Sequence, residues 1–331
     1  METKCNLCGA IKPLKSNTHY LTDAIIRPCL NSIGAKGREK GLFFDISTNQ
    51  TFLTPHFQRE TNIDKIVEVY GREPNADEIE ETRSKRAYSV DNVFCSDCEA
   101  KFTSIENVFL RNIEKFKTGK FSDSKIIRRF FYLQLWRTAI CDENFIIPEN
   151  TLQYMKHCLQ DDCELSEMNR LPLSITYLET PKGCESENGV GIAVGANPYV
   201  ILMNDFIIQL YDSVSAVQFY ALLGINKIET YKSFINYDET EFKIQVIDNA
   251  SRIKFYQTYY LKKKMPTFIN GITWYFSNMY YQVFHTLPND NEIQMYIQNA
   301  IQKYKYLFEE NMSNAFADFL QLKCKNNTFV S

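Results

Sequence analysis

Apolar residues recur at three- and four-residue spacing after Ser96, and this period predicts an amphipathic helix. The apolar positions are Phe102, Ile105, Val108, Phe109, Ile113 and Phe116. The same spacing, together with polar residues suited to helix starts, predicts helices over 124–140, 151–159, 213–223 and 292–310. The segment 61–69 fits either helix or strand, and the acidic segment 73–81 fits a solvated loop or a helix start.

Short apolar runs bounded by turn residues predict β-strands. They lie at 42–46, 173–178, 190–194, 199–203, 206–211, 242–248 and 252–260. Gly and Asn-Pro turns separate the strands that follow Leu171, as hairpins require. The glycines at 189, 191 and 195 lack the lysine of a phosphate-binding loop, so they also predict a hairpin. The whole pattern predicts a mixed α+β fold.

The chain of 331 residues is long enough for two domains. Residues 1–110 are polar and rich in turn residues, and Gly119 interrupts the helical pattern that follows them. We therefore expect a boundary near residue 120. It would separate an N-terminal module over 1–115 from an α+β domain over 120–331 that binds substrate, a trigger or a partner.

The composition is that of an ordinary globular protein, with 44% hydrophobic and 23% charged residues, except that aromatic residues reach 14%. A net charge of −3 gives no overall attraction to nucleic acid, so a binding face for it would have to be local. The polar N-terminus lacks the apolar run of a secretory signal, and no stretch approaches the ~20 apolar residues of a membrane span. We expect a cytoplasmic protein that makes no membrane contact.

Two Cys-x-x-Cys pairs give the strongest chemical signal in the sequence. Cys5 and Cys8 form the first pair, and Cys95 and Cys98 form the second. Four thiolates in two such pairs suit one structural Zn²⁺, although the interval between the pairs is longer than in common zinc ribbons. The alternative is four independent reduced cysteines. The six other cysteines are scattered, and we expect them to be buried thiols.

The residues around these pairs resemble a known family. Thr18-His19-Tyr20 follows the first pair, and Asp91-Asn92-Val93-Phe94 leads into the second pair, which Glu99 follows directly. In this order the N-terminal module is similar to the HNH endonucleases of the zinc-stapled, ββα-metal kind, and in particular to a bacterial subgroup with Glu after the second pair. The resemblance implies an N-terminal ββα-metal (HNH) zinc module followed by a mixed α+β domain, and it extends only faintly beyond the module.

The resemblance also implies roles for single residues. His19 would be the general base, and its near-neutral unperturbed pKa suits that task. Asn92 would hold the hairpin and orient the imidazole. Glu99 would be a ligand of a catalytic Mg²⁺ or Mn²⁺, since both ions favour oxygen donors. Thr18 stands where many members have Asp or His, so a further ligand is expected elsewhere. Glu106, on the same helical face as Glu99, is one candidate, with a salt bridge or solvent exposure as its alternative; His56 is a second candidate base.

The implied reaction is hydrolysis of DNA phosphodiester bonds, and such modules often act in bacterial restriction or anti-phage defence. Arg27, Arg38 and Lys40 are candidates for contacts with the DNA phosphates. Two further basic clusters, over 115–129 and 252–264, suit either a nucleic-acid groove or a solvated face. The alternatives are a non-catalytic zinc ribbon that binds nucleic acid or protein, and an RNase of the same fold. A protein partner or a homo-oligomer also remains open.

Overall fold

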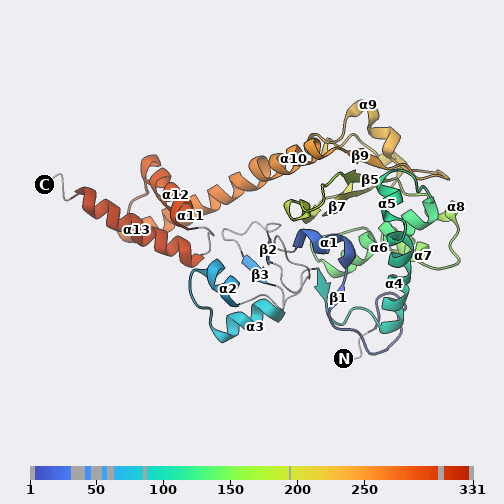
Figure 1. Ribbon diagram of the computed structural model, residues 1–331, viewed down its shortest axis with the longest axis horizontal. Coiled ribbons are helices and arrows are strands. Elements are labelled where there is room, and N and C mark those ends of the chain that lie inside the picture. Colours follow the sequence, from blue (N-terminus) through green and yellow to red (C-terminus); the bar gives the residue numbers. More distant parts are fainter. Residues whose placement is uncertain are drawn as a thin grey trace. The chain divides into compact units, whose positions relative to one another are not determined.

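The computed structural model describes residues 4–30, 42–45, 54–57, 63–84, 88–193, 195–304 and 309–327. The fold is mixed α+β, as predicted, and the contacts divide it into two compact units (Figure 1). Unit 1 consists of residues 1–38 and 86–256, and unit 2 of residues 39–85 and 257–331.

Unit 1 contains both Cys pairs and most of the strands. Its helices are α1 (Asp23–Leu30), α4 (Ser96–Leu110), α5 (Ile113–Lys117), α6 (Ser124–Cys141), α7 (Glu149–Cys158), α8 (Leu165–Met168), α9 (Ile228–Tyr231) and α10 (Asn249–Thr258), of which the last two residues belong to unit 2. Its strands are β1 (Thr18–His19), β4 (Ser89–Val90), β5 (Leu173–Leu178), β6 (Gly189–Ala193), β7 (Tyr199–Asn204), β8 (Phe206–Leu210) and β9 (Gln245–Ile247).

Strands β5 to β9 form one sheet in the order β6-β7-β8-β5-β9. The neighbours are antiparallel except for β9, which lies parallel to β5. Helix α6 is buried along almost its whole length and joins this sheet to α4. Phe131 of α6 packs on Phe206 of β8, and Phe130 stacks on Phe109 of α4 with 4.0 Å between ring centroids. Much of the high aromatic content of the chain therefore fills the core of unit 1.

The expected boundary near residue 120 falls inside unit 1. Helix α4 lies before it and α6 after it, yet Phe109 and Phe130 of these two helices stack on each other. The contacts thus join residues 88–115 to the following sheet and helices. The division of function between 1–115 and 120–331 stays a prediction.

Two arginines of the predicted basic clusters are buried in unit 1. The side chain of Arg128 is fully buried and pairs with Glu239 at 2.8 Å, while also donating to the carbonyls of Leu171 and Asn236. Arg252 donates to Asn188 at 2.6 Å. Both guanidiniums hold the fold together from inside, so neither is part of a solvated basic face.

Most of the predicted elements are present. The helices predicted from Ser96, over 124–140 and over 151–159 are confirmed as α4, α6 and α7, and the predicted strands between 173 and 211 are confirmed as β5 to β8. The glycine-spaced segment is a hairpin, because β6 pairs antiparallel with β7. Within the ambiguous segment 61–69, the described residues 63–69 are helical, as part of α2.

Three predicted elements are wrong. The strand over 252–260 is helix α10 and its continuation, because Arg252, Phe255 and Tyr256 are buried at helical spacing. The helix over 213–223 is replaced by short 3₁₀ turns, since Leu222 and Leu223 have positive φ values of 31° and 53°. The helix over 292–310 is interrupted, because α12 ends at Lys303 and Tyr304 is extended.

Unit 2 combines a short hairpin with helices. Its elements are β2 (Leu42–Asp45), β3 (Thr54–Phe57), α2 (Ile63–Tyr70), α3 (Ala76–Ser84), α11 (Met265–Phe284), α12 (Asp290–Lys303) and α13 (Glu309–Asn327), with a π-helical turn, η6 (Tyr259–Lys264), before α11. Strands β2 and β3 pair antiparallel. The core of α11 to α13 is aromatic, and Phe276 stacks on Tyr296 with 4.3 Å between ring centroids. Among the helices that the structure describes, none has the length and apolarity that crossing a membrane requires.

Candidate metal centre

A narrow antiparallel ribbon in unit 1 brings the two distant Cys pairs together. Thr18 pairs with Val90 and His19 with Ser89, which defines β1 and β4. The pairing continues toward the second Cys pair, because Lys15 N donates to Phe94 O at 2.8 Å and Leu14 is bridged to Cys95. The chain leaves this ribbon after β1 and returns to it at β4, so the long interval between the pairs does not separate them in space.

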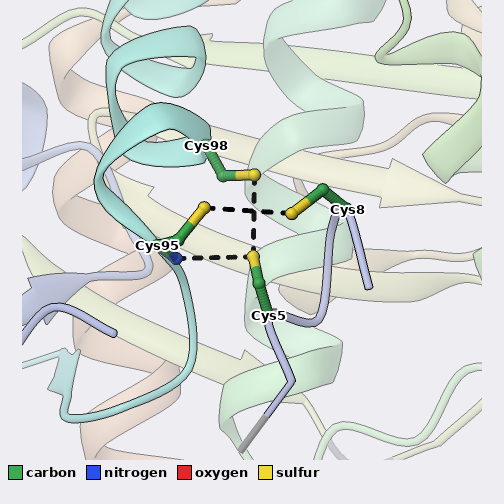
Figure 2. A group of neighbouring side chains, drawn as sticks. All are labelled: Cys5, Cys8, Cys95 and Cys98. Atoms are coloured by element: carbon green, nitrogen blue, oxygen red, sulfur yellow. Dashed lines mark hydrogen bonds between the residues drawn. The ribbon is translucent and has the colours of Figure 1, made fainter. Parts of the chain in front are cut away.

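The four cysteine side chains converge on one point (Figure 2). Their sulfur atoms all lie within 4.8 Å of one another, with 3.6 Å from Cys5 to Cys98 and 3.9 Å from Cys8 to Cys95. Four thiolates at a Zn–S distance of ~2.3 Å on a tetrahedron would have sulfurs about 3.8 Å apart. The observed spacing fits that geometry and is far too long for disulfides, which have S–S bonds of about 2.05 Å. These four cysteines can hold a metal ion such as Zn²⁺.

The backbone around Cys5 favours its thiolate. Burial by itself raises the pKa of this thiol, but hydrogen bonds from backbone groups of Cys8, Cys95 and Leu7 outweigh it and lower the pKa to about 7. The amide of Cys95 lies 3.4 Å from the Cys5 sulfur. Burial and the neighbouring thiols raise the pKa of Cys98. Of these two thiols, Cys5 is therefore the one that more readily gives up its proton to a metal.

Side chains from α4, α6 and α7 fix the Cys cluster on the rest of unit 1. Phe94, next to Cys95, lies against Phe102 and Trp136 with ring centroids 5.1 Å and 5.8 Å away. On another side, Lys156 of α7 donates to the carbonyl of Asn6 at 3.1 Å. The Cys cluster therefore packs on the buried rings of Phe94, Phe102 and Trp136, its aromatic base, and is hydrogen-bonded to α7, a helix outside the predicted module.

Glu99 is the predicted ligand with the most unusual surroundings. It lies in the first turn of α4, directly after Cys98, and its Oε1 atom is buried without a hydrogen-bond partner. Burial raises the pKa of this carboxyl group, although Arg137 and Lys15 oppose the shift. A buried carboxylate oxygen without a donor is costly, and a divalent cation would satisfy it.

Glu106, the second predicted carboxylate ligand, already has partners. It accepts hydrogen bonds from Thr22 Oγ1 and from Arg137, each at 2.8 Å. Gln134 of α6 adds a contact to the same point, because its Oε1 accepts from Thr22 N at 2.9 Å. The salt-bridge alternative for Glu106 is therefore present, and its role as a metal ligand stays a prediction.

The ribbon positions His19, Thr18 and Asn92. His19 ends β1 and is half-buried, and the Oγ1 atom of the preceding Thr18 is buried without a hydrogen-bond partner. Asn92 is exposed and has a left-handed backbone with φ of 60°. Its backbone N–H donates to Lys15 O at 2.9 Å, so Asn92 closes the turn that leads to the second Cys pair. Its predicted contact with the His19 ring stays a prediction.

The predicted phosphate contacts are only partly described. Arg27 lies in α1, where its guanidinium pairs with Asp23 one turn earlier. Arg38, Lys40 and the side chain of His56 lie outside the described residues.

Comparison of the chain with models of protein families, with curated proteins and with solved structures finds no match.

Sequence reasoning missed three residues that support the centre: Thr22, Gln134 and Arg137. The sequence did carry a signal for two of them: Gln134 lies within the apolar run 130–136, and Arg137 follows it directly. A polar residue that is buried among apolar neighbours needs a partner, and here the partners are Thr22 and Glu106.

Proposed function

We propose that this protein is an HNH-type, metal-dependent endonuclease that hydrolyses phosphodiester bonds in DNA. The support is the order of the elements and residues around the Cys cluster. Strand β1 ends at His19, β4 pairs with it, and α4 starts between the two cysteines of the second pair. A ββα-metal (HNH) module requires two paired strands followed by a helix, with Zn²⁺ bound at their base.

The observation on which the proposal depends most is the unpartnered Oε1 of Glu99. It lies one residue after a cysteine of the metal centre, in the turn where the module would present a ligand to its catalytic ion. A hard oxygen donor fits Mg²⁺ or Mn²⁺ rather than a second zinc. Such an ion, when bound, would stabilise the charge that develops on the phosphate oxygens.

The roles of the other residues follow from what each can do. His19 would take a proton from the attacking water through one nitrogen of its imidazole. Asn92 would keep the turn between β4 and the second pair in the shape that presents the imidazole. The bridge from Glu106 to Arg137 would hold α4 against α6, so that Glu99 keeps a fixed position while the reaction proceeds.

DNA is the proposed substrate, and Arg27 a residue that would contact its backbone near the site. We also propose that the protein works in the reducing cytoplasm of a bacterium, as an effector of restriction or anti-phage defence. The support is indirect: all the described cysteines are free thiols. A protein partner or a second copy of the chain would then supply the trigger.

Plasmid cleavage tests the proposal. Wild-type protein with Mg²⁺ or Mn²⁺ should nick and linearise the plasmid, and His19→Ala should lose this activity. His285→Asn is a matched control, because His285 lies at the end of α11 and has a left-handed backbone that Asn tolerates. Equal cleavage by His19→Ala and wild type would remove His19 from the mechanism.

Parallel digestion of double-stranded DNA, single-stranded DNA and RNA distinguishes the DNase from an RNase of the same fold. A third outcome favours the non-catalytic zinc ribbon. In that case the protein would bind nucleic acid or protein without cleaving it, and neither Mg²⁺ nor Mn²⁺ would bind to the zinc-loaded chain in a Glu99-dependent way.

A further inference from the structure

A second group of metal-ligating side chains lies in unit 1, away from the four cysteines. It consists of His157, Cys163 and Glu167, whose ligand atoms all lie within 4.8 Å of one another. His157 is in the last turn of α7, Cys163 is in the loop that follows, and Glu167 is in α8. A nitrogen, a sulfur and an oxygen donor thus meet at the connection between two helices.

The carboxylate of Glu167 is oriented by the backbone. Its Oε2 accepts from the amide of Glu164 at 3.1 Å in a capping box, which leaves Oε1 facing His157 Nε2 at 3.5 Å. One oxygen is therefore fixed by a backbone donor and the other is directed at the imidazole. Secondary contacts of this kind hold metal ligands in position in proteins.

The connection itself is held by further hydrogen bonds. Tyr154 of α7 donates from its hydroxyl to the carbonyl of Glu167 at 2.6 Å, and the same hydroxyl accepts from Arg170 N at 3.2 Å. The amide of Gln160 donates to His157 O at 2.9 Å. These contacts fix α7 and α8 relative to each other and hold the start of the loop between them. They therefore hold the spacing of the helical ligands His157 and Glu167, between which Cys163 lies.

A hydrogen bond between His157 and Glu167 accounts for two of the three residues, whereas the Cys163 sulfur has a long contact of 3.8 Å with the carbonyl of Glu164 and a further contact with Cys158. The Cys163 side chain is buried, at 1% exposure, yet its sulfur lies within 4.8 Å of ligand atoms of both partners. In contrast, the side chains of His157 and Glu167 are 53% and 40% exposed. The group is therefore closed on the sulfur side and open to water on the other, as in sites where three protein ligands and one water hold an ion.

We propose that His157, Cys163 and Glu167 form a second metal site that binds Zn²⁺ with a water molecule as its fourth ligand. The donor set decides the ion. Thiolate and imidazole ligands together select a borderline-soft cation such as Zn²⁺ over Mg²⁺ or Ca²⁺, which take oxygen ligands. The site is independent of the nuclease proposal, because none of its residues belongs to the Cys cluster or to the predicted catalytic group.

Metal titration tests the site. The full chain is first loaded with one equivalent of Zn²⁺, which the four-cysteine centre takes up, and is then titrated with Co²⁺ as a spectroscopic probe. Wild-type protein should bind a Co²⁺ ion at this site with the charge-transfer absorption of a single thiolate, a band that Co²⁺ at the proposed catalytic site beside Glu99 would not give. Cys163→Ser should lose this band, and His157→Ala and Glu167→Gln should weaken the binding of the ion that produces it.

Cys184→Ser is the matched control, since Cys184 lies outside both groups and the variant should bind Co²⁺ as wild type does. Far-UV circular dichroism and the retained first equivalent of Zn²⁺ show that each variant is folded. The proposal is overturned if wild type shows no single-thiolate band on addition of Co²⁺, or if this band survives in Cys163→Ser.

Discussion

The indole ring of Trp136 lies against the ring of Phe94, with 5.8 Å between the ring centroids. Phe94 directly precedes Cys95, whereas Trp136 lies in the buried helix α6. Trp136 is 1% exposed, so its surroundings are set by the packing at the base of the Cys cluster. This contact couples the metal centre to the core of unit 1 and makes the indole a reporter of both.

Removal of the metal should change the fluorescence of Trp136. The chain has two tryptophans, and Trp274 is 66% exposed, so Trp274→Phe leaves Trp136 as the single reporter at little cost. In this variant a strong chelator should shift the emission to the red and lower the midpoint of thermal unfolding, since structural zinc contributes folding energy directly. Emission spectra and melting curves before and after chelation measure both effects.

Cys95→Ser should reproduce the chelated state, whereas Cys184→Ser, a change of one cysteine outside the cluster, should behave like its parent. An unchanged emission spectrum after complete metal removal would show that the Cys cluster does not support the aromatic base.

Removing one partner of the salt bridge between Arg137 and Glu106 should lower the stability of the protein strongly. Their side chains are 3% and 18% exposed, and the distance between Arg137 Nη1 and Glu106 Oε1 is 2.8 Å. Arg137→Ala leaves a largely buried carboxylate without its counter-charge, so we expect a loss of about 3–5 kcal/mol in the free energy of unfolding. Urea denaturation followed by circular dichroism gives this value.

The double variant Glu106→Gln with Arg137→Met removes both charges and keeps the volumes similar. It should be markedly more stable than Arg137→Ala, because no uncompensated charge remains. If the two variants are equally destabilised, the arginine acts through packing rather than through its charge.

The sequence predicted the parts of unit 1 in which local pattern and tertiary packing agree. The apolar spacing of α4, the hairpin of β6 and β7, and the convergence of the two Cys pairs all follow from residues close in sequence or from a motif. In α10 the pattern was misleading, because the aromatic residues favour strand by propensity while burial at helical spacing decides the outcome.

Long-range partners account for most of what the sequence could not predict. Helix α11 was missed, since its aromatic run shows its helical face only when Ile272, Phe276 and Tyr280 are known to be buried. The link from Thr22 to Gln134 joins positions 112 residues apart. No local pattern identifies which carboxylate has a partner, so the difference between Glu99 and Glu106 appears only in the structure.

Replacing Glu99 should separate stability from ion binding. Glu99→Gln removes a buried charge whose Oε1 has no donor, so we expect the zinc-loaded protein without Mn²⁺ to become more stable by roughly 1 kcal/mol, a rise of about 2–4 °C in Tm. Wild type should gain stability on addition of Mn²⁺, because the ion satisfies this oxygen, and Glu99→Gln should not. Thermal unfolding of zinc-loaded protein with and without Mn²⁺ measures both effects.

Glu143→Gln, at an exposed position, is the control and should respond to Mn²⁺ as wild type does. Lower stability of Glu99→Gln without Mn²⁺ would indicate that the carboxylate has a protein partner after all.

In unit 2, the contact between Glu292 and Lys323 should make stability depend on pH. Burial by itself raises the pKa of Glu292, but Lys323, the amide of Asn289 and the hydroxyl of Tyr280 together lower it below the ordinary value. A carboxyl group with a lowered pKa in the folded state stabilises the protein above its unfolded pKa, and loses that contribution as the pH falls through the folded pKa. We therefore expect Glu292→Gln to destabilise the protein at pH 7, with a difference from wild type that shrinks as the pH falls below about 4.3, the ordinary Glu pKa. Urea midpoints of both proteins between pH 7 and pH 3 measure this difference.

Glu80→Gln, at an exposed position of α3 in the same unit, is the control. Its stability should differ from that of wild type by a small amount that does not vary with pH in this way. A constant gap between Glu292→Gln and wild type over the whole range would mean that Glu292 stabilises α12 through its capping hydrogen bonds and not through its charge.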